Sequence, residues 1–284
     1  MKMIKQTFVL VAILFSLSFT SCTKPVEKEI GLQLWSVRDD MKTDAVATIQ
    51  KVGEIGYSFI ETAGYGDGKF YGMDPVEFKT LVNNSGMEFL ASHTGRALPD
   101  SSNWDETMTW WDVCIDAHAA AGVKYIVQPF MDQKGYGSLA DLKLYCDYFN
   151  AVGEKCNDKG ILFGYHNHDK EFQEVDSIRR YDFMLQNTDP DKVFFQLDLY
   201  WITIGGQNPV DYFNTYPGRF RLWHVKDEKE LGAGSAIMDF KPIFEAAKVS
   251  GLEHYIVEVE RYDFAPLESV KMSYDFLMGA EYIK

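Results

Sequence analysis

The segment DKGILFGYHNHD, residues 158–169, carries the pattern that predicts the fold of the whole chain. Gly160 follows a stretch with helical periodicity, and a glycine there can take the left-handed conformation that closes a helix. The run from Leu162 to His166 is apolar and has the composition of a buried strand. Polar residues begin where that run ends. A closed helix, a buried strand and a polar strand end in direct succession are typical of one unit of a β/α repeat.

The same succession recurs from Ile30 onward, where we identify eight β/α units. Their strands begin roughly every thirty residues, as a β/α repeat requires. The strand candidates are Gly31 to Ser36, Phe59 to Ala63, Glu88 to His93, Tyr125 to Pro129, Leu162 to His166, Val193 to Leu197, Phe220 to Val225 and Tyr255 to Glu260. Stretches with helical spacing of apolar residues include Ala45 to Glu54, Pro75 to Asn83, Trp104 to Ala121, Leu139 to Lys159, Ile178 to Gln186 and Phe240 to Val249. Glycines expected to close helices stand at Gly56, Gly86, Gly122, Gly160 and Gly251.

Eight such units predict an α/β fold, a closed (β/α)8 TIM barrel in a single domain that spans residues 30–284. About 250 residues is the usual size of one such barrel. An open dinucleotide-binding sheet fits less well, because no GxGxxG motif follows the first strand. In these barrels the chemistry takes place at the carboxyl ends of the strands. The polar residues at those ends are therefore the candidate functional residues.

The first residues predict export. Two lysines precede an apolar run, residues 8–19, that ends just before Cys22. This is the arrangement of a signal peptide over residues 1–21, and the run is shorter than the ~20 apolar residues of a membrane-spanning helix. Cys22 resembles the cysteine of the bacterial lipobox, which is acylated after cleavage, while plain secretory cleavage is the alternative. We therefore expect a cell-envelope lipoprotein, in the periplasm or outer membrane of a Gram-negative bacterium, held to the membrane only by a lipid on Cys22 and a tether, residues 22–29.

The composition narrows the possible partners. The net charge is −14, from 28 basic and 42 acidic residues, and no basic cluster is present. Such a chain repels a phosphate backbone, so we expect no nucleic-acid partner. The three cysteines beyond the tether follow no regular spacing, so buried thiols are expected rather than a disulfide framework: Cys114, Cys146 and Cys156.

Histidines and carboxylates gather at the predicted strand ends, mainly after the later strands. Four of the six histidines lie there. Imidazole and carboxylate groups that converge from separate strands form a mixed nitrogen and oxygen site for a divalent metal such as Mn, Co, Zn or Mg, with open positions for substrate oxygens. The residues at these ends include Glu61, His93, Gln128, His166, His168, Glu171, Asp198, Trp201, His224, Lys226, Glu258 and Glu260.

For several histidines and carboxylates of the chain, a structural role is the alternative to a role in ligand binding. A lone histidine such as His93 is more often a satisfied core or rim residue than a ligand. Glu61 is either a substrate ligand or an acceptor for the backbone of the next loop. His118, inside a helix, and His254, before the last strand, are expected to be structural. Asp198 ends an apolar strand, where a buried charge needs a partner, so we expect a metal or a cation beside it.

Five stretches resemble the xylose isomerase-like barrel family, which includes ketose 3-epimerases, inosose dehydratase, hydroxypyruvate isomerase and endonuclease IV. In the epimerases of this family a glutamate, an aspartate, a histidine and a glutamate from the last four strands hold the metal. The resemblance implies Asp198, His224 and Glu258 as ligands. At strand five this chain has His166, or alternatively His168, where the epimerases have the first glutamate. The five stretches are GLQLWSVRD (31–39), GYHNHD (164–169), LDLYW (197–201), HVKD (224–227) and IVE (256–258).

Two departures from the epimerase pattern bear on the implied reaction. Epimerases of this family move protons with two glutamates on opposite faces of the substrate carbon, and an imidazole replaces one of them here. Trp201 stands where those epimerases have a histidine. Paired histidines after strand five resemble inosose dehydratase and related lyases, which remove a proton beside a carbonyl and expel a β-oxygen.

The resemblance implies a metal-dependent isomerase or epimerase of an unphosphorylated sugar that abstracts a proton next to a metal-polarised carbonyl or hydroxyl. A keto-sugar or keto-glycoside lyase or dehydratase is the alternative, and a non-catalytic sugar-binding lipoprotein is a second one. The expected catalytic residues are Glu258, His168 and Lys226, of which the lysine would stabilise an enolate. The expected substrate-binding residues are Glu171, Trp35, Trp201, His93 and Glu61. Nothing in the sequence indicates the oligomeric state.

Overall fold

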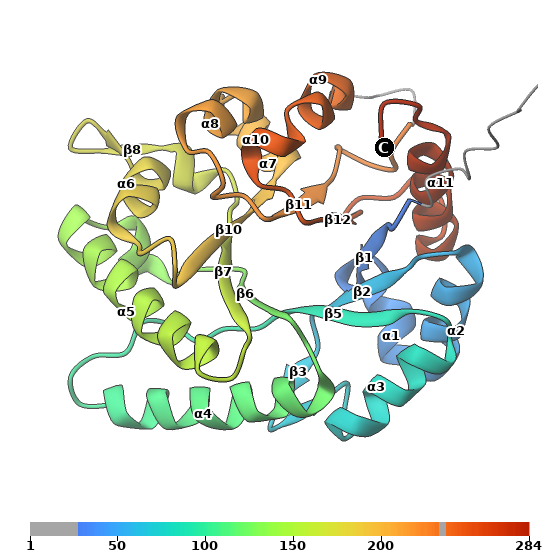
Figure 1. Ribbon diagram of the computed structural model, residues 1–284, viewed down its shortest axis with the longest axis horizontal. Coiled ribbons are helices and arrows are strands. Elements are labelled where there is room, and N and C mark those ends of the chain that lie inside the picture. The colour runs from blue at the N-terminus through green and yellow to red at the C-terminus, as the bar shows by residue number, and fades with distance from the viewer. Residues whose placement is uncertain (1–27, 233–236, 284) are drawn as a thin grey trace, which may run out of the picture.

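Eight parallel strands close into a barrel in the computed structural model, which describes residues 28–232 and 237–283 (Figure 1). Each strand pairs with its neighbours along the repeat, and the last strand pairs with the first. The predicted (β/α)8 barrel is thereby confirmed. The barrel strands are β1 (Gly31–Gln33), β2 (Phe59–Thr62), β5 (Glu88–His93), β6 (Tyr125–Gln128), β7 (Leu162–His166), β10 (Val193–Asp198), β11 (Leu222–Val225) and β12 (His254–Val257).

Helices surround the barrel and connect its strands (Figure 1). Among the described residues, none of these helices is both long and apolar enough to cross a membrane. The α-helices are α1 (Arg38–Thr43), α2 (Ala45–Ile55), α3 (Pro75–Asn84), α4 (Trp104–Ala121), α5 (Leu139–Asn157), α6 (Arg180–Asn187), α7 (Leu199–Ile204), α8 (Pro209–Thr215), α9 (Phe240–Glu245), α10 (Ala247–Ser250) and α11 (Pro266–Gly279). Short 3-10 helices are η1 (Leu34–Val37), η2 (Gln133–Tyr136) and η3 (Lys170–Phe172). Two hairpins pair β3 (Tyr65–Gly66) with β4 (Lys69–Phe70) and β8 (Glu174–Val175) with β9 (Ile178–Arg179).

The predicted boundaries are right for β5, β7 and α4, and elsewhere most of them shift. Strand one ends early, at Gln33, because its side chain accepts a hydrogen bond from the backbone N–H of Trp35 and starts η1. The last strand ends at Val257, so Glu258 follows the strand instead of lying within it. The single helix expected over residues 240–249 is two helices, α9 and α10.

Helix α7 is not revealed by the periodicity of the sequence. Its six residues are mostly β-branched or aromatic, and such residues favour strands. The helix begins because the carboxylate of Asp198 accepts a hydrogen bond from the backbone N–H of Trp201 at 2.8 Å. A local cap at the end of β10 therefore overrides the propensity of the segment. Helices α1, α8 and α11 are likewise absent from the predicted set.

The glycines expected to close helices do so. All five have a positive φ angle: Gly56, Gly86, Gly122, Gly160 and Gly251. After α4, for example, Gly122 has a φ of 74° and its N–H reaches back to the carbonyl of Ala119. The chain can then turn directly into the next barrel strand.

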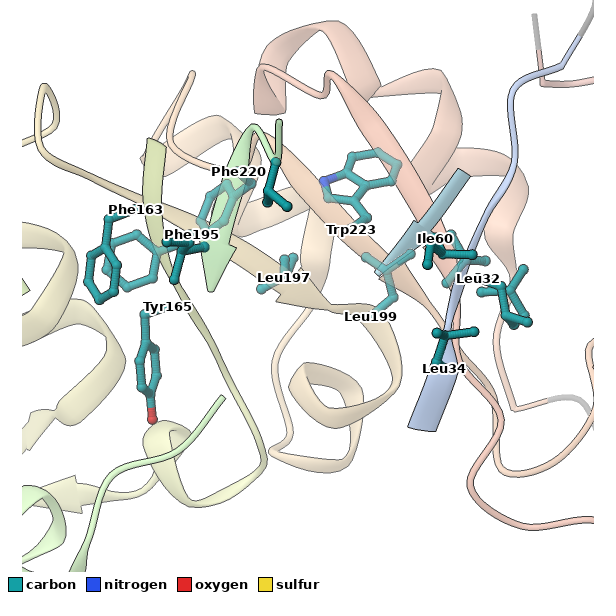
Figure 2. Close-up of a cluster of buried hydrophobic side chains, with 14 of the residues drawn as sticks. Leu32, Leu34, Ile60, Phe163, Tyr165, Phe195, Leu197, Leu199, Phe220 and Trp223 are labelled. Carbon is teal, nitrogen blue, oxygen red and sulfur yellow. The ribbon is translucent and has the colours of Figure 1, made fainter. Parts of the chain in front are cut away.

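The main hydrophobic core lies between the barrel and its helices. Strand residues from distant parts of the chain pack into it, as Figure 2 shows for Leu32, Ile60, Phe163, Phe195 and Trp223. Burial of this apolar surface is the dominant stabilising contribution in a domain of this size. The three cysteines expected to be buried thiols are buried and free: Cys114, Cys146 and Cys156.

A smaller apolar cluster fills part of the barrel interior. Gly164 of β7 makes room for it, because a Cβ atom there would lie 2.5 Å from the ring of Phe194. Side chains alternate along a strand, so the inward-facing residues beyond this cluster lie nearer the carboxyl ends of the strands. The cluster consists of Phe59, Leu90, Ala91, Tyr125, Val127, Phe194, Leu222 and Ile256.

The predicted signal peptide, residues 1–21, and Cys22 lie outside the described residues. Of the predicted tether, only Lys28 and Glu29 are described.

Candidate metal centre

Strand alternation carries polar side chains into the barrel beyond its inner apolar cluster. On β10, Phe194 belongs to that cluster, so Gln196 and Asp198 face the same way. On β11 and β12 the pattern repeats, and the apolar residue is followed two positions later by His224 and by Glu258. Residues far apart in the sequence therefore meet inside the barrel.

The four residues expected as metal ligands come together in one buried cluster. A nitrogen or oxygen atom from each of His166, Asp198, His224 and Glu258 lies within 4.8 Å of the others. Nε2 of His166 is 3.9 Å from Oδ2 of Asp198, and Nδ1 of His224 is 3.2 Å from Oε2 of Glu258. His168, the alternative ligand of strand five, is not part of this group. Two imidazoles and two carboxylates at these separations are a donor set suited to a divalent transition metal.

One oxygen of the cluster has no hydrogen-bond partner. Oδ1 of Asp198 caps α7, whereas Oδ2 is buried and accepts no hydrogen bond. Its nearest cation is Nζ of Lys226, at 3.8 Å. The pKa of Asp198 is raised to about 6, because burial and the neighbouring Glu258 raise it more than Lys226 lowers it. Burying a carboxylate oxygen without a hydrogen-bond partner is energetically unfavourable, and a bound cation would compensate for this penalty.

Lys226 is the buried counter-charge of the cluster. Its ammonium group is 3.0 Å from Oε2 of Glu258 and 2.7 Å from Oε2 of Glu260, and it lies 5.0 Å from the centre of the Trp201 ring. Burial alone would lower the pKa of this lysine, but Glu258, Asp198 and Glu260 outweigh burial and raise it. The lysine therefore remains charged.

The histidines of the cluster differ in charge. Burial lowers the pKa of His166 well below its usual value, so its ring is neutral at neutral pH. Burial also lowers the pKa of His93, whose ring stacks on that of His224 at 5.0 Å. For His224 burial acts in the same direction, but the carboxylates of Glu258 and Glu61 outweigh it and raise the pKa to about 10. In the metal-free protein His224 thus carries a second proton in a place where a cation would be favourable.

A pocket of about 510 Å³ opens onto this cluster. That volume is in the range of small-molecule sites. Its lining has a polar part and an aromatic part. One part is polar and is formed by His93, His166, His168, Glu258 and Glu260, and the other is aromatic and is formed by Trp35, Tyr65, Trp110 and Phe130.

Two tryptophans of the aromatic part are each supported by an arginine. The guanidinium of Arg38 lies 5.1 Å from the centre of the Trp35 ring, and that of Arg96 lies 5.2 Å from the centre of the Trp110 ring. Trp35 is nevertheless 44% exposed. A cation on one face holds an aromatic ring in place and leaves another face for a ligand.

Glu61 and Glu171, expected to bind substrate, do not line the pocket and are fully buried. Glu171 accepts hydrogen bonds from the hydroxyls of Tyr136 and Tyr165 and, at 3.1 Å, from the backbone N–H of His168. Because Glu171 is buried outside the pocket, it does not line the substrate pocket as expected. It instead holds the backbone of the loop that carries His168.

The other expected site residues are close to the pocket. His93 and His168 line it, as does Trp35. Trp201 is not a lining residue, and its ring lies 5.9 Å from that of His168 and beside Lys226. Trp201 therefore packs beside two polar groups of the site without lining the pocket.

Sequence reasoning missed several residues of the site. Gln33 and Gln196 are buried inside the barrel, and the two-residue spacing from Gln196 to Asp198 was a signal for one of them. Trp110 gave no such signal, because it lies on α4 and not at a strand end. Tyr65 reaches the pocket from the β3–β4 hairpin, which the sequence did not predict.

Comparison with known proteins identifies the family. The sequence profile of the xylose isomerase-like TIM barrel family matches residues 49–278. The chain therefore belongs to this family, and the resemblance seen in the sequence is confirmed.

Three relatives illustrate the range of similarity. A crystal structure of a sugar phosphate isomerase/epimerase from Parabacteroides distasonis is 32% identical, with a TM-score of 0.85 over 91% of this chain and 100% of that one. An inosose dehydratase from Geobacillus thermodenitrificans is 26% identical over 231 residues, which are 68% of this chain and 76% of the relative. The structure of the IOLI protein with a bound zinc atom is 15% identical and shares the fold, with a TM-score of 0.68 over 88% of this chain and 97% of that one.

Proposed function

We propose that this protein is a metal-dependent isomerase or epimerase of an unphosphorylated sugar. The observation that carries the proposal is the convergence of two histidines and two carboxylates within 4.8 Å at a pocket of small-molecule size. The lining of this pocket includes two carboxylates, and no lysine or arginine is among its described residues. Such a lining favours a neutral sugar over a sugar phosphate.

His166, Asp198, His224 and Glu258 would hold the metal. The unpartnered Oδ2 of Asp198 supports this assignment, as does the bound zinc of the IOLI protein, which shares the fold. The charges agree as well, since the three buried carboxylates of Asp198, Glu258 and Glu61 exceed by one the two buried positive charges, those of Lys226 and the doubly protonated His224. A divalent metal bound there supplies polarisation of a substrate carbonyl or hydroxyl, which acidifies the neighbouring C–H group.

Glu258 and His168 would be the two groups that move the proton. Both line the pocket, and Glu171 fixes the backbone of His168. Lys226 donates a hydrogen bond to Glu258 at 3.0 Å and keeps that carboxylate ionised. The ammonium group would also stabilise a developing enolate. A carboxylate and an imidazole can thus exchange a proton with the same substrate carbon.

We expect Asp198→Asn to lose metal affinity. The amide keeps the Oδ1 acceptor that caps α7, but it replaces the anionic Oδ2 by a neutral group. The loss should be at least the roughly 10–100-fold that follows removal of an outer-shell partner. Metal titration of the purified full chain by calorimetry measures it, with Glu230→Gln, a buried carboxylate outside the cluster, as the matched control. Equal affinity in the wild type and Asp198→Asn would contradict the assigned ligands.

The reaction is tested by incubation with ketoses and keto-glycosides in deuterium oxide, followed by NMR. We expect one deuterium on the carbon beside the carbonyl and an isomerised product. Glu258→Gln should slow this exchange by roughly 10²–10⁴-fold, as is typical for loss of a general acid–base group. Release of a β-substituent would instead assign the lyase activity. Sugar binding without exchange or release would contradict an enzyme and support a binding protein.

The second candidate function is a lyase acting on keto-glycosides. The aromatic part of the pocket favours it, because tryptophans held by Arg38 and Arg96 offer faces for a second ring attached to the reacting sugar. Similarity to an inosose dehydratase, a protein named for an elimination, agrees with this candidate.

Trp110→Leu separates a substrate with a second ring from a simple sugar. We expect kcat/KM to fall about 2- to 10-fold for a keto-glycoside with a sugar or aryl aglycone, the usual worth of one aromatic stacking contact. The same variant should leave kcat/KM for the methyl keto-glycoside unchanged. Trp104→Leu, on the same helix but outside this pocket, is the matched control. Equal losses on both substrates would argue against a second-ring contact.

We also propose that the enzyme acts in the cell envelope, anchored through Cys22. The apolar run that ends before this cysteine supports the proposal. Expressed in a Gram-negative host, the wild type should enter the detergent phase on phase partitioning, and Cys22→Ala should enter the aqueous phase. Mass spectrometry that finds residues 1–21 still attached in the wild type would refute it.

A further inference from the structure

The carboxylate of Glu61 is fully buried inside the barrel and is surrounded by donors. It accepts hydrogen bonds at 2.8 Å from Nε2 of Gln33 and at 2.8 Å from Nε2 of Gln196. Nε2 of His224 lies 2.6 Å from it, and Nε2 of His93 lies 3.2 Å from it. Each of four strands, β1, β5, β10 and β11, thus contributes one hydrogen-bond donor to the carboxylate of Glu61.

The charge of Glu61 sets the direction of these hydrogen bonds, because a carboxylate only accepts. The amide nitrogen of Gln196 must face Glu61, so the amide oxygen faces away from it. That oxygen is 3.0 Å from Nδ1 of His166 and 2.6 Å from Nε2 of His93. Since an amide oxygen is an acceptor, both of these ring nitrogens must carry a proton.

The positions of the protons determine where the lone pairs point. A neutral imidazole has one N–H group and one lone pair, so the lone pair of His166 is on Nε2. That atom faces Oδ2 of Asp198. The ring of His224 donates through Nε2 to Glu61, which leaves Nδ1, beside Oε2 of Glu258, as the atom available to a metal. Both ligand atoms therefore face the cluster.

We propose that Glu61 is a positioning residue that sets the ring protons of three histidines, directly for His224 and through Gln196 for His166 and His93. It thereby directs the lone pair of His166 into the cluster, and that of His224 once the proton on Nδ1 is lost. Any effect on metal binding rests on the function proposed above. The proton positions themselves do not, because they exist in the metal-free protein.

Proton–nitrogen NMR of the histidine rings in the metal-free full chain at neutral pH tests the proposal. Signals are assigned by their loss in His166→Gln and His93→Gln. Both ring nitrogens of His224 lie beside a carboxylate, Nε2 beside Glu61 and Nδ1 beside Glu258, so the result is read at the other two rings. We expect the proton of His166 on Nδ1 and that of His93 on Nε2. A His166 proton on Nε2 in the wild type would overturn the proposal.

Glu61→Gln should change these positions. Its amide oxygen can still accept from Gln33 and His224, but its NH2 group then faces Gln196 and reverses that amide. The nitrogen of Gln196 now meets His166, whose proton should move to Nε2. Metal affinity should fall roughly 10–100-fold, as for loss of an outer-shell partner. An unchanged His166 proton in the folded variant would contradict the proposal.

A carboxylate exchange provides the rescue. In the double variant Glu61→Gln with Gln196→Glu, the new carboxylate accepts from the residue-61 amide and from both histidines. Every donor then faces an acceptor again, so the His166 proton should return to Nδ1 and metal affinity should recover. A merely structural role for Glu61 predicts no such recovery, and a folded double variant that keeps the proton on Nε2 would overturn the proposal.

Controls separate this inference from the proposed function. Glu230→Gln changes a buried carboxylate that accepts hydrogen bonds from the Ser269 hydroxyl and the backbone N–H of Asp263, and it should leave all ring protons in place. If Glu61→Gln does not fold, the wild type and the double variant still decide the outcome. Expected proton positions in a wild type that binds no metal would support the role of Glu61 and contradict the metal centre alone.

Discussion

Burial of charge inside a closed barrel is the constraint on which the rest of the structure depends. Glu61, Asp198 and Glu258 bring three carboxylates into the interior, where an uncompensated charge is costly. Each is compensated differently: Glu61 by a shell of donors, Glu258 by Lys226 and His224, and Asp198 only on one oxygen. The compensation is therefore incomplete at one atom, Oδ2 of Asp198, which lies 3.9 Å from Nε2 of His166. The chemistry of the site follows from this imbalance.

The pocket joins this charged cluster to an aromatic wall. The polar groups come from the carboxyl ends of β5, β7 and β12, whereas the aromatic groups come from η1, the β3–β4 hairpin, α4 and the loop after β6. Arginines stack on Trp35 and Trp110, and such cation–π contacts favour one orientation of each ring before a ligand binds. Preorganised rings reduce the entropic cost of ordering a ligand. The two parts can therefore recognise different parts of one substrate.

His166 distinguishes this cluster from the glutamate pair of the epimerases that the sequence resembles. A neutral ligand in place of an anion lowers the negative charge around a metal, and its direction depends on which ring nitrogen carries the proton. A glutamate needs no such control, because both of its oxygens can bind. In our proposal this control comes from Gln196, which donates a hydrogen bond to Glu61 and accepts one from His166. The exchange also leaves Glu258 without a second carboxylate at the position of His166, and His168, which lines the pocket, takes the proton-transfer role in the proposed function.

The sequence by itself determined the barrel and most of the metal cluster, because both depend on local order. Glycines after helices, short apolar runs and polar strand ends recur along the chain, and closure of a β/α repeat brings its strand ends together. Only the tertiary structure decided the roles of Glu61, Glu171, Gln33 and Gln196. Their burial and hydrogen-bond directions depend on partners that lie up to 163 residues away along the chain. Only the folded barrel likewise placed Trp110 of α4 at the pocket. Neither spacing nor composition encodes such contacts, since they arise when distant strands and helices pack around the same interior.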